Sequence, residues 1–236
     1  MKALITWGGW PGHEPEVVAD LFRRMLENEG MEVTLTDSLD CFDDAEGLRA
    51  LDLIVPVWTM SELSRERATN VSEAVARGTG IAGCHGGMCD AFRGNPLWQF
   101  ITGGQWVAHP GGDGQRYTVH ITRPDEALVR DIPDFEVETE QYYLHVDPAN
   151  HILATTHFPT VRWYHSPNGT VEMPVAWTRA WGLGRVYYNA LGHKANVIAE
   201  GAPHEMLRRG LRWAAEGKAL AAGQGVDQFQ SPGSHW

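Results

Sequence analysis

Apolar segments of strand length alternate with amphipathic helical segments in the first half of the chain, and this alternation constrains the fold more than any other feature. The four apolar segments are residues 2–7, 31–36, 51–58 and 80–84. Two segments between them, residues 16–29 and 64–77, place apolar residues every three or four positions, and a glycine follows each. Buried strands that alternate with helices form a parallel sheet covered on both faces. We therefore predict an α/β fold with a sheet between two helical layers.

The second half of the chain contains further strand candidates separated by turn-like breaks. They are residues 116–121, 136–146, 152–156, 173–181 and 185–191. Asn168-Gly169 and Gly182-Leu183-Gly184 are typical of hairpin turns. We expect an antiparallel extension of the same sheet, so that residues 1–216 form a single domain. A last helix is expected at 203–216, and residues 217–236 are expected to form a C-terminal tail.

Charge and composition exclude several classes of partner. The chain has 19 Lys+Arg against 30 Asp+Glu, a net charge of −11, and an acidic surface repels nucleic acid. No run approaches the roughly 18 apolar residues that a membrane span needs, so no membrane association is expected. Three cysteines do not make a disulfide framework, and the first residues do not read as a signal peptide. We expect a cytoplasmic protein that binds a small molecule, and the apolar second half leaves room for a homo-oligomer interface.

Polar and aromatic side chains follow three of the predicted parallel strands. His13, Trp58 and His85 all stand at the carboxyl ends of strand segments. Because these ends meet at one edge of a parallel sheet, where α/β proteins bind ligands, we expect these residues to lie close together.

A reactive residue flanked by glycines follows the strand at 80–84. Cys84 is preceded by Gly83 and followed by His85-Gly86-Gly87. A strand, a sharp turn and a helix in this order are the layout of a nucleophile elbow, in which Cys84 would be the nucleophile and amide groups of the turn would hold an oxyanion. The same pattern also fits an inert cysteine at the end of a buried strand.

The segment around Cys84 is followed by further patterns that together resemble the ThuA-like, or trehalose-utilisation, family. They are residues 80–85, 95–104, His109-Pro110, Glu138-Thr139-Glu140-Gln141-Tyr142, Pro174-Val175-Ala176-Trp177, 184–193 and Leu211-Arg212-Trp213-Ala214. The resemblance covers residues 1–216 and implies a flavodoxin-like fold similar to that of class I glutamine amidotransferases.

The resemblance also implies which residues form the site. The elbow histidine, here His85, is the characteristic residue of the family, and the position before it is often not cysteine. This moves the expected site from the thiol to His85, His109, Glu140 and His193. The family's acidic pair is Asp-Glu, and here Thr139-Glu140 lacks one carboxylate unless Glu138 replaces it.

Three histidines and a glutamate support two kinds of chemistry. A His–Glu pair can perform general acid–base catalysis, with His85, Glu140, His193 and Cys84 as the catalytic candidates. His85, His109 and His193 can equally hold Zn²⁺ or another divalent metal with one position open for water. The chain contains no H-x-x-x-H or H-E-x-x-H spacing, so a metal site would have to be assembled by the fold.

Aromatic residues suggest that the ligand is a carbohydrate. The chain has 10 Trp, and flat aromatic rings with a few polar groups suit the faces and hydroxyls of sugar rings. The expected substrate-binding residues are Trp10, His13, Trp58, His109 and Tyr142. Strand alternation places Glu138, Glu140 and Tyr142 on one face and His145 on the other, if the strand at 136–146 is unbroken.

Three functions remain open at this point. The first is an enzyme of carbohydrate metabolism that acts on a glycoside or an oxidised sugar at a cleft lined by histidine and glutamate. The second is an amidotransferase or hydrolase that depends on Cys84, and the third is a sugar- or metabolite-binding protein without catalytic activity. Fold alone does not choose among them.

Overall fold

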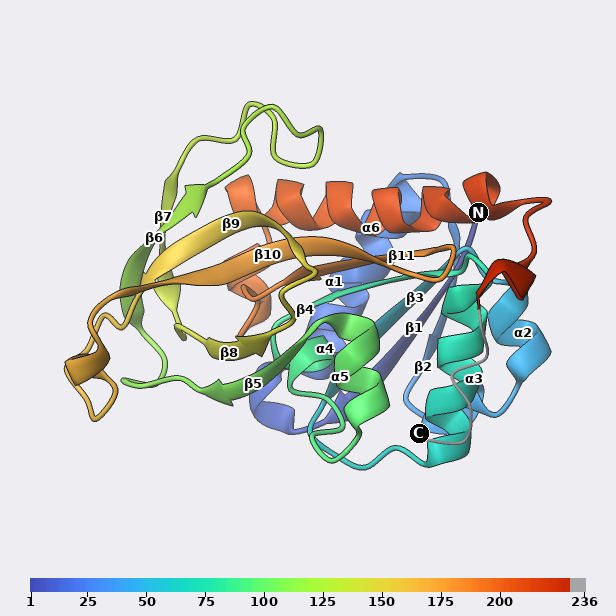
Figure 1. Ribbon diagram of the computed structural model, residues 1–236, viewed down its shortest axis with the longest axis horizontal. Helices are drawn as coiled ribbons and strands as arrows, with labels where there is room; N and C mark the ends of the chain where they lie inside the picture. The colour runs from blue at the N-terminus through green and yellow to red at the C-terminus, as the bar shows by residue number, and fades with distance from the viewer. Residues whose placement is uncertain (230–236) are drawn as a thin grey trace.

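The computed structural model describes residues 1–229, which form two sheets and two layers of helices (Figure 1). The larger sheet has nine strands. They are β1 (Lys2–Gly9), β2 (Glu32–Thr36), β3 (Leu53–Thr59), β4 (Gly80–Cys84), β6 (Gln115–Ile121), β7 (Phe135–Thr139), β9 (His151–Phe158), β10 (Val171–Trp181) and β11 (Gly184–Asn189). Their order in the sheet is β2-β1-β3-β4-β11-β10-β9-β6-β7. The predicted α/β fold is confirmed.

The sheet is parallel from β2 to β11 and antiparallel from β11 to β7. The five parallel strands therefore end at the same edge, as the strand–helix alternation predicts. The antiparallel strands extend the same sheet, and the turn at Gly182-Leu183 joins β10 to β11 through the pair Trp181–Gly184.

The strand expected at 136–146 is broken, which corrects the prediction. β7 ends at Thr139, and β8 (Tyr143–Val146) pairs with β5 (Gly104–Ala108) in a separate sheet of two strands. Residues 140–142 connect the two sheets and are buried. The period-two pattern of side chains does not carry across a segment that changes sheets, so the assignment of Glu140 and Tyr142 to one strand face fails.

The helices that cover the sheet are α1 (Pro15–Asn28) and α6 (Gly201–Ala221) on one face and α3 (Arg65–Ala76) and α5 (Pro96–Thr102) on the other. Short helices α2 (Ala45–Ala50) and α4 (Gly86–Cys89) complete the order. Glycine allows α6 to lie close to the sheet, because a Cβ at Gly80 would stand 2.3 Å from the carbonyl oxygen of Ala214.

The last helix extends five residues beyond the expected end at 216, because Gly217 and Ala221 are buried against the fold and continue its apolar stripe. Part of the expected tail at 217–236 is thus helical, and residues 230–236 lie outside the described residues. Within residues 1–229, none of the helices is both long and apolar enough to cross a membrane.

Candidate functional site

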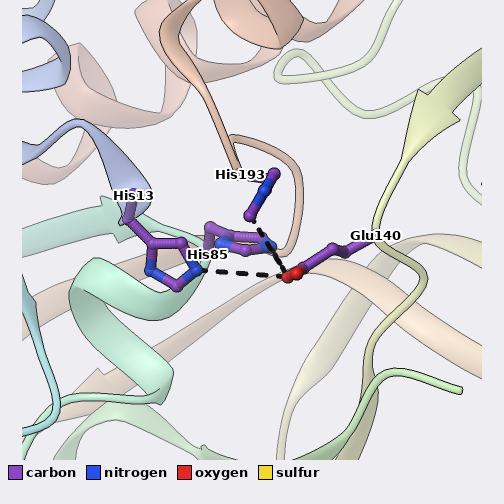
Figure 2. A group of neighbouring side chains, drawn as sticks. All are labelled: His13, His85, Glu140 and His193. Atoms are coloured by element: carbon purple, nitrogen blue, oxygen red, sulfur yellow. Dashed lines mark ion pairs between the residues drawn. The ribbon is translucent and has the colours of Figure 1, made fainter. Parts of the chain in front are cut away.

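Four buried side chains converge at the carboxyl edge of the parallel strands (Figure 2). They are His13, His85, Glu140 and His193, here called the histidine–glutamate centre. One ligand atom from each lies within 4.8 Å of those of the other three. Glu140 Oε2 is 3.3 Å from His193 Nδ1, 3.4 Å from His85 Nε2 and 4.0 Å from His13 Nε2.

The topology of the sheet places the three histidines of the centre. His13 lies just after β1, His85 directly after β4, and His193 just after β11. These strands are parallel, so residues 180 positions apart in the chain meet at one edge. The prediction that His13 and His85 are neighbours is confirmed, since their ring centroids are 4.7 Å apart.

His85, and not Cys84, stands at the apex of the elbow. Its φ of 48° and ψ of −138° are rare for a residue with a Cβ, and such a conformation turns the side chain away from the strand direction. Its backbone is held on both sides, because its N–H donates to Asn189 O at 2.7 Å and its carbonyl accepts from Tyr188 Oη at 3.2 Å. The imidazole is therefore fixed toward the centre.

Cys84 points into the core and does not contact the centre in any hydrogen bond or ion pair among residues 1–229. The residue is 3% exposed, and its Sγ lies against the backbone of Gly192. Burial raises the pKa of the thiol to about 12. A nucleophilic cysteine needs a depressed pKa and a neighbouring base, so the geometry speaks against the catalytic role suggested for Cys84.

Glu140 reaches the centre from the connection between β7 and β8. Its backbone carbonyl accepts a hydrogen bond from Tyr117 Oη at 2.9 Å. The next residue, Gln141, is 1% exposed and donates to Thr156 Oγ1 at 3.1 Å, while its Oε1 accepts from Thr160 N at 3.0 Å. These contacts hold the broken strand in place and aim the carboxylate of Glu140 between the histidines.

Three of the four atoms that face the middle of the centre are buried without a hydrogen-bond partner among residues 1–229. Glu140 Oε2, His85 Nε2 and His193 Nδ1 are all buried, and their only contacts with one another are the long ion pairs of 3.3 and 3.4 Å to Glu140. Buried polar atoms left unpaired cost about 1–3 kcal/mol each unless a ligand satisfies them. Ligands about 2.1 Å from a tetrahedral zinc ion lie about 3.4 Å from one another. The separations of 3.3 and 3.4 Å from Glu140 Oε2 to His193 and His85 match that spacing, and the separation of 4.0 Å to His13 is longer.

Each histidine of the centre also has a partner for its other ring nitrogen. His13 Nδ1 is 2.7 Å from Thr59 Oγ1, and His85 Nδ1 is 3.0 Å from Tyr142 Oη. His193 Nε2 is 3.5 Å from Asp113 Oδ2. Outer partners of this kind fix the ring and its tautomer, and they are typical of histidines that bind metals. A hydrogen donated outward by Nδ1 leaves the Nε2 lone pair of His13 and His85 facing the centre.

The electrostatics favour neutral imidazoles beside an ionised carboxylate. Burial, followed by repulsion from His85 and His193, lowers the pKa of His13 to about 2, and burial lowers the pKa of His85 to about 4. Burial on its own would raise the pKa of Glu140, but His193 and His85 outweigh it and hold this pKa well below its ordinary value. Neutral imidazole and ionised carboxylate are the forms that bind a divalent cation.

The other residues expected in the site lie at different distances from it. His109 is outside the set of four, with its Nδ1 3.7 Å from Glu140 Oε1 and its side chain 36% exposed. The ring of Trp10 is 4.7 Å from that of His13 and is 42% exposed, so it borders the centre. Trp58 packs against Gly8 and donates to Ser61 Oγ at 3.0 Å, and none of its hydrogen bonds or ring contacts within 1–229 reaches the centre.

Tyr142 has a different position from the one that strand alternation suggests. Its ring stacks on that of His85 with centroids 3.9 Å apart, so it supports a member of the centre. Glu138 does not supply the missing carboxylate, because it is exposed and pairs with Arg116 at 2.9 Å.

Sequence reasoning missed three contributions. His13 was assigned to substrate binding only, although it belongs to the centre. The other two are Thr59 and Asp113, which orient His13 and His193, and a hydroxyl or carboxylate in that role has only a weak local signature. The end of β3 and the run Gly111-Gly112-Asp113-Gly114 after His109-Pro110 were the available signals.

Comparisons with known proteins agree with this fold. The family model ThuA, described as trehalose utilisation, matches residues 2–214. A ThuA-like protein of Bacteroides uniformis ATCC 8492 is 17% identical, with a TM-score of 0.71 and 91% of each chain covered. One from Parabacteroides merdae ATCC 43184 is 19% identical, with a TM-score of 0.70 over 92% of this chain and 91% of that one.

A third solved structure, a cytoplasmic protein of Salmonella typhimurium LT2, is 13% identical, with a TM-score of 0.61 over 93% of this chain and 99% of that one. No curated protein sequence matches the chain. At these identities the solved structures establish a shared fold.

Proposed function

This chain belongs to the ThuA family, and from that premise we propose that it is a cytoplasmic enzyme of carbohydrate metabolism that works through a divalent metal bound at the histidine–glutamate centre. The substrate is a glycoside or an oxidised sugar. The family description, trehalose utilisation, supports a sugar as the substrate. The four clustered side chains support a metal as the cofactor.

One observation carries the metal: Glu140 Oε2 lies 3.3 Å from His193 Nδ1 and 3.4 Å from His85 Nε2, the ligand spacing of a tetrahedral site, and all three atoms are buried without a hydrogen bond among residues 1–229. Three imidazoles with one carboxylate are borderline ligands that suit zinc and similar divalent ions. Glu140 is the single formal charge among the four ligands, so a bound dication would leave a net charge of +1 in a buried site. That charge favours an anionic or strongly polarised substrate oxygen.

A divalent cation in this position supplies Lewis acidity toward a substrate oxygen or a water molecule. The chain provides the remaining functions. His109 stands at the edge of the centre, more exposed than any of the four ligands, and we assign to it proton exchange with the substrate. Trp10, beside His13, offers a flat apolar surface to a sugar ring.

The test is metal analysis of protein purified without an affinity tag. The wild-type chain should hold about one equivalent of zinc or another divalent ion per chain, and His85→Ala and His193→Ala should lose it. His109→Ala should keep it, because this histidine lies outside the set of four. The exposed His145 provides the matched control, since His145→Ala removes an imidazole without touching the centre.

Activity is then measured on a panel of glycosides and oxidised sugars before and after chelation. Loss of activity on chelation and recovery with added metal would support the proposal. Absence of metal from the wild-type protein, together with no gain on adding zinc, manganese or nickel, would refute the metal centre. Stoichiometric metal without turnover of any sugar would refute the enzymatic role and leave a sugar-binding protein.

A further inference from the structure

A hollow lies beside the histidine–glutamate centre and is not part of it. Residues 106–111 and 161–163 line it, and its volume is 540 Å³. We call it the aromatic hollow. Small-molecule sites are typically hollows of about 300–1,000 Å³ with mainly apolar walls and a few polar groups.

The aromatic hollow adjoins the centre through His109. This residue lines the hollow, and its Nδ1 is 3.7 Å from Glu140 Oε1. Flat rings continue from the hollow to the centre. The ring centroid of Trp106 is 5.4 Å from that of His109 and 6.3 Å from that of Tyr142, and Tyr142 stacks on His85. A ligand in the hollow would thus be next to a ligand at the centre.

The walls carry the groups that bind sugar rings. Trp163 is 48% exposed and Trp106 is partly buried, so both offer indole surface to a ligand. Trp106 is held rigidly, because the guanidinium of Arg93 lies 4.3 Å from its ring centroid and Arg93 pairs with the buried Asp90. Its Nε1 is buried without a hydrogen-bond partner among residues 1–229.

Arg162 adds a polar group to the lining of the hollow. It is exposed and makes no hydrogen bond or ion pair with residues 1–229, so its five N–H donors are available to hydroxyl groups. An exposed tryptophan beside an unpaired arginine is the kind of surface that binds a polar ligand with flat apolar faces.

We propose that the aromatic hollow is the subsite for a second sugar ring, so that the substrate is a disaccharide with the ring that reacts at the centre and the other ring on Trp163. This inference rests on the proposed function and adds the specificity: the chain discriminates a two-ring glycoside from a one-ring glycoside through residues 161–163. Trp106 and Trp163 contact the second ring, and Arg162 binds its hydroxyls.

The experiment compares binding of two-ring and one-ring probes by calorimetry, on the metal-loaded protein. The probes are trehalose, maltose and cellobiose against methyl α- and β-glucoside. Trp163→Ala should weaken binding of the preferred disaccharide by roughly tenfold, the value of a lost aromatic stacking contact, and leave binding of the methyl glucosides unchanged. Phe229→Ala is the control, because Phe229 is an aromatic residue that is 45% exposed and does not line the hollow.

The outcomes separate this inference from the proposed function. If the protein binds methyl glucosides and disaccharides equally, or if Trp163→Ala weakens both alike, the subsite is overturned while the metal centre stands. If no disaccharide binds to wild-type protein that holds metal, the subsite is also overturned. Loss of metal binding with selective disaccharide binding intact would refute the metal centre and leave the subsite supported.

Discussion

Replacing Tyr142 with phenylalanine tests whether the outer partners of the histidines organise the centre. The residue is 4% exposed, and its hydroxyl lies 3.0 Å from His85 Nδ1. Tyr142→Phe keeps the ring stacked on His85 but removes the oxygen that orients the imidazole. A buried ring nitrogen is then left without a partner, because His85 is 1% exposed.

Two effects of known size follow from this change. Loss of an outer-shell hydrogen bond lowers metal affinity by about 10- to 100-fold, which corresponds to roughly 1.4–2.7 kcal/mol. The unpaired nitrogen should lower the free energy of unfolding of the metal-free protein by about 1–3 kcal/mol. Metal affinity is measured by competition with a chromogenic chelator, and stability by urea denaturation of the metal-free protein.

Thr79→Val is the control for this experiment. Thr79 is equally buried, and its hydroxyl donates to the carbonyl of Leu51 at 3.1 Å, just before β4 and at the opposite end of that strand from His85. The control substitution should lower the free energy of unfolding by a similar amount without changing metal affinity. Equal metal affinities for wild type and Tyr142→Phe, or equal losses in both variants, would refute the assignment of Tyr142 as the residue that orients His85.

Two substitutions and one labelling experiment test other parts of the structure. Gly86→Ala should lower metal affinity at least about tenfold in the same competition assay, because its Cβ would stand 2.4 Å from His13 Cε1 and force that ring out of place; unchanged affinity would remove His13 from the centre. Cys84 should resist iodoacetamide at pH 7 in the native protein and react after unfolding, as followed by mass spectrometry, because burial raises its pKa to about 12; rapid native alkylation would restore the thiol hypothesis. Glu205→Gln should lower the free energy of unfolding at pH 7 by about 1 kcal/mol, a value reduced by solvent screening of this surface pair. Hydrogen bonding to Arg208 lowers the pKa of Glu205 from 4.5 to about 2, so this stability is present above pH 4.5 and is lost as the pH falls toward 2; a difference from wild type that persists at pH 2 would contradict it.

The positions of His85 and His193 could be anticipated, whereas their partners could not. Both follow apolar runs of strand length, and the edge at which parallel strands end is fixed by the strand–helix alternation. Glu140 was identified through resemblance to a family, but its geometry depends on a strand that breaks after Thr139. The sequence around Thr139 gives no reason for that break. The buried side chain of Gln141 stabilises the broken segment, and its hydrogen-bond partners, Thr156 and Thr160, lie far along the chain.

Cys84 shows why the site needed the tertiary structure. The pattern Gly-Cys-His-Gly-Gly fits an elbow centred on either residue, and only the backbone angles of His85 decide between them. The thiol at the end of β4 faces the core, and the positive φ of His85 turns the imidazole toward the centre. The sequence determined the α/β fold, the antiparallel extension and the edge that carries the site, because apolar periodicity and turn residues are local. The tertiary structure alone decided which four side chains meet, because ligand atoms within 4.8 Å come from positions 13, 85, 140 and 193, and only long-range strand pairing sets their distances.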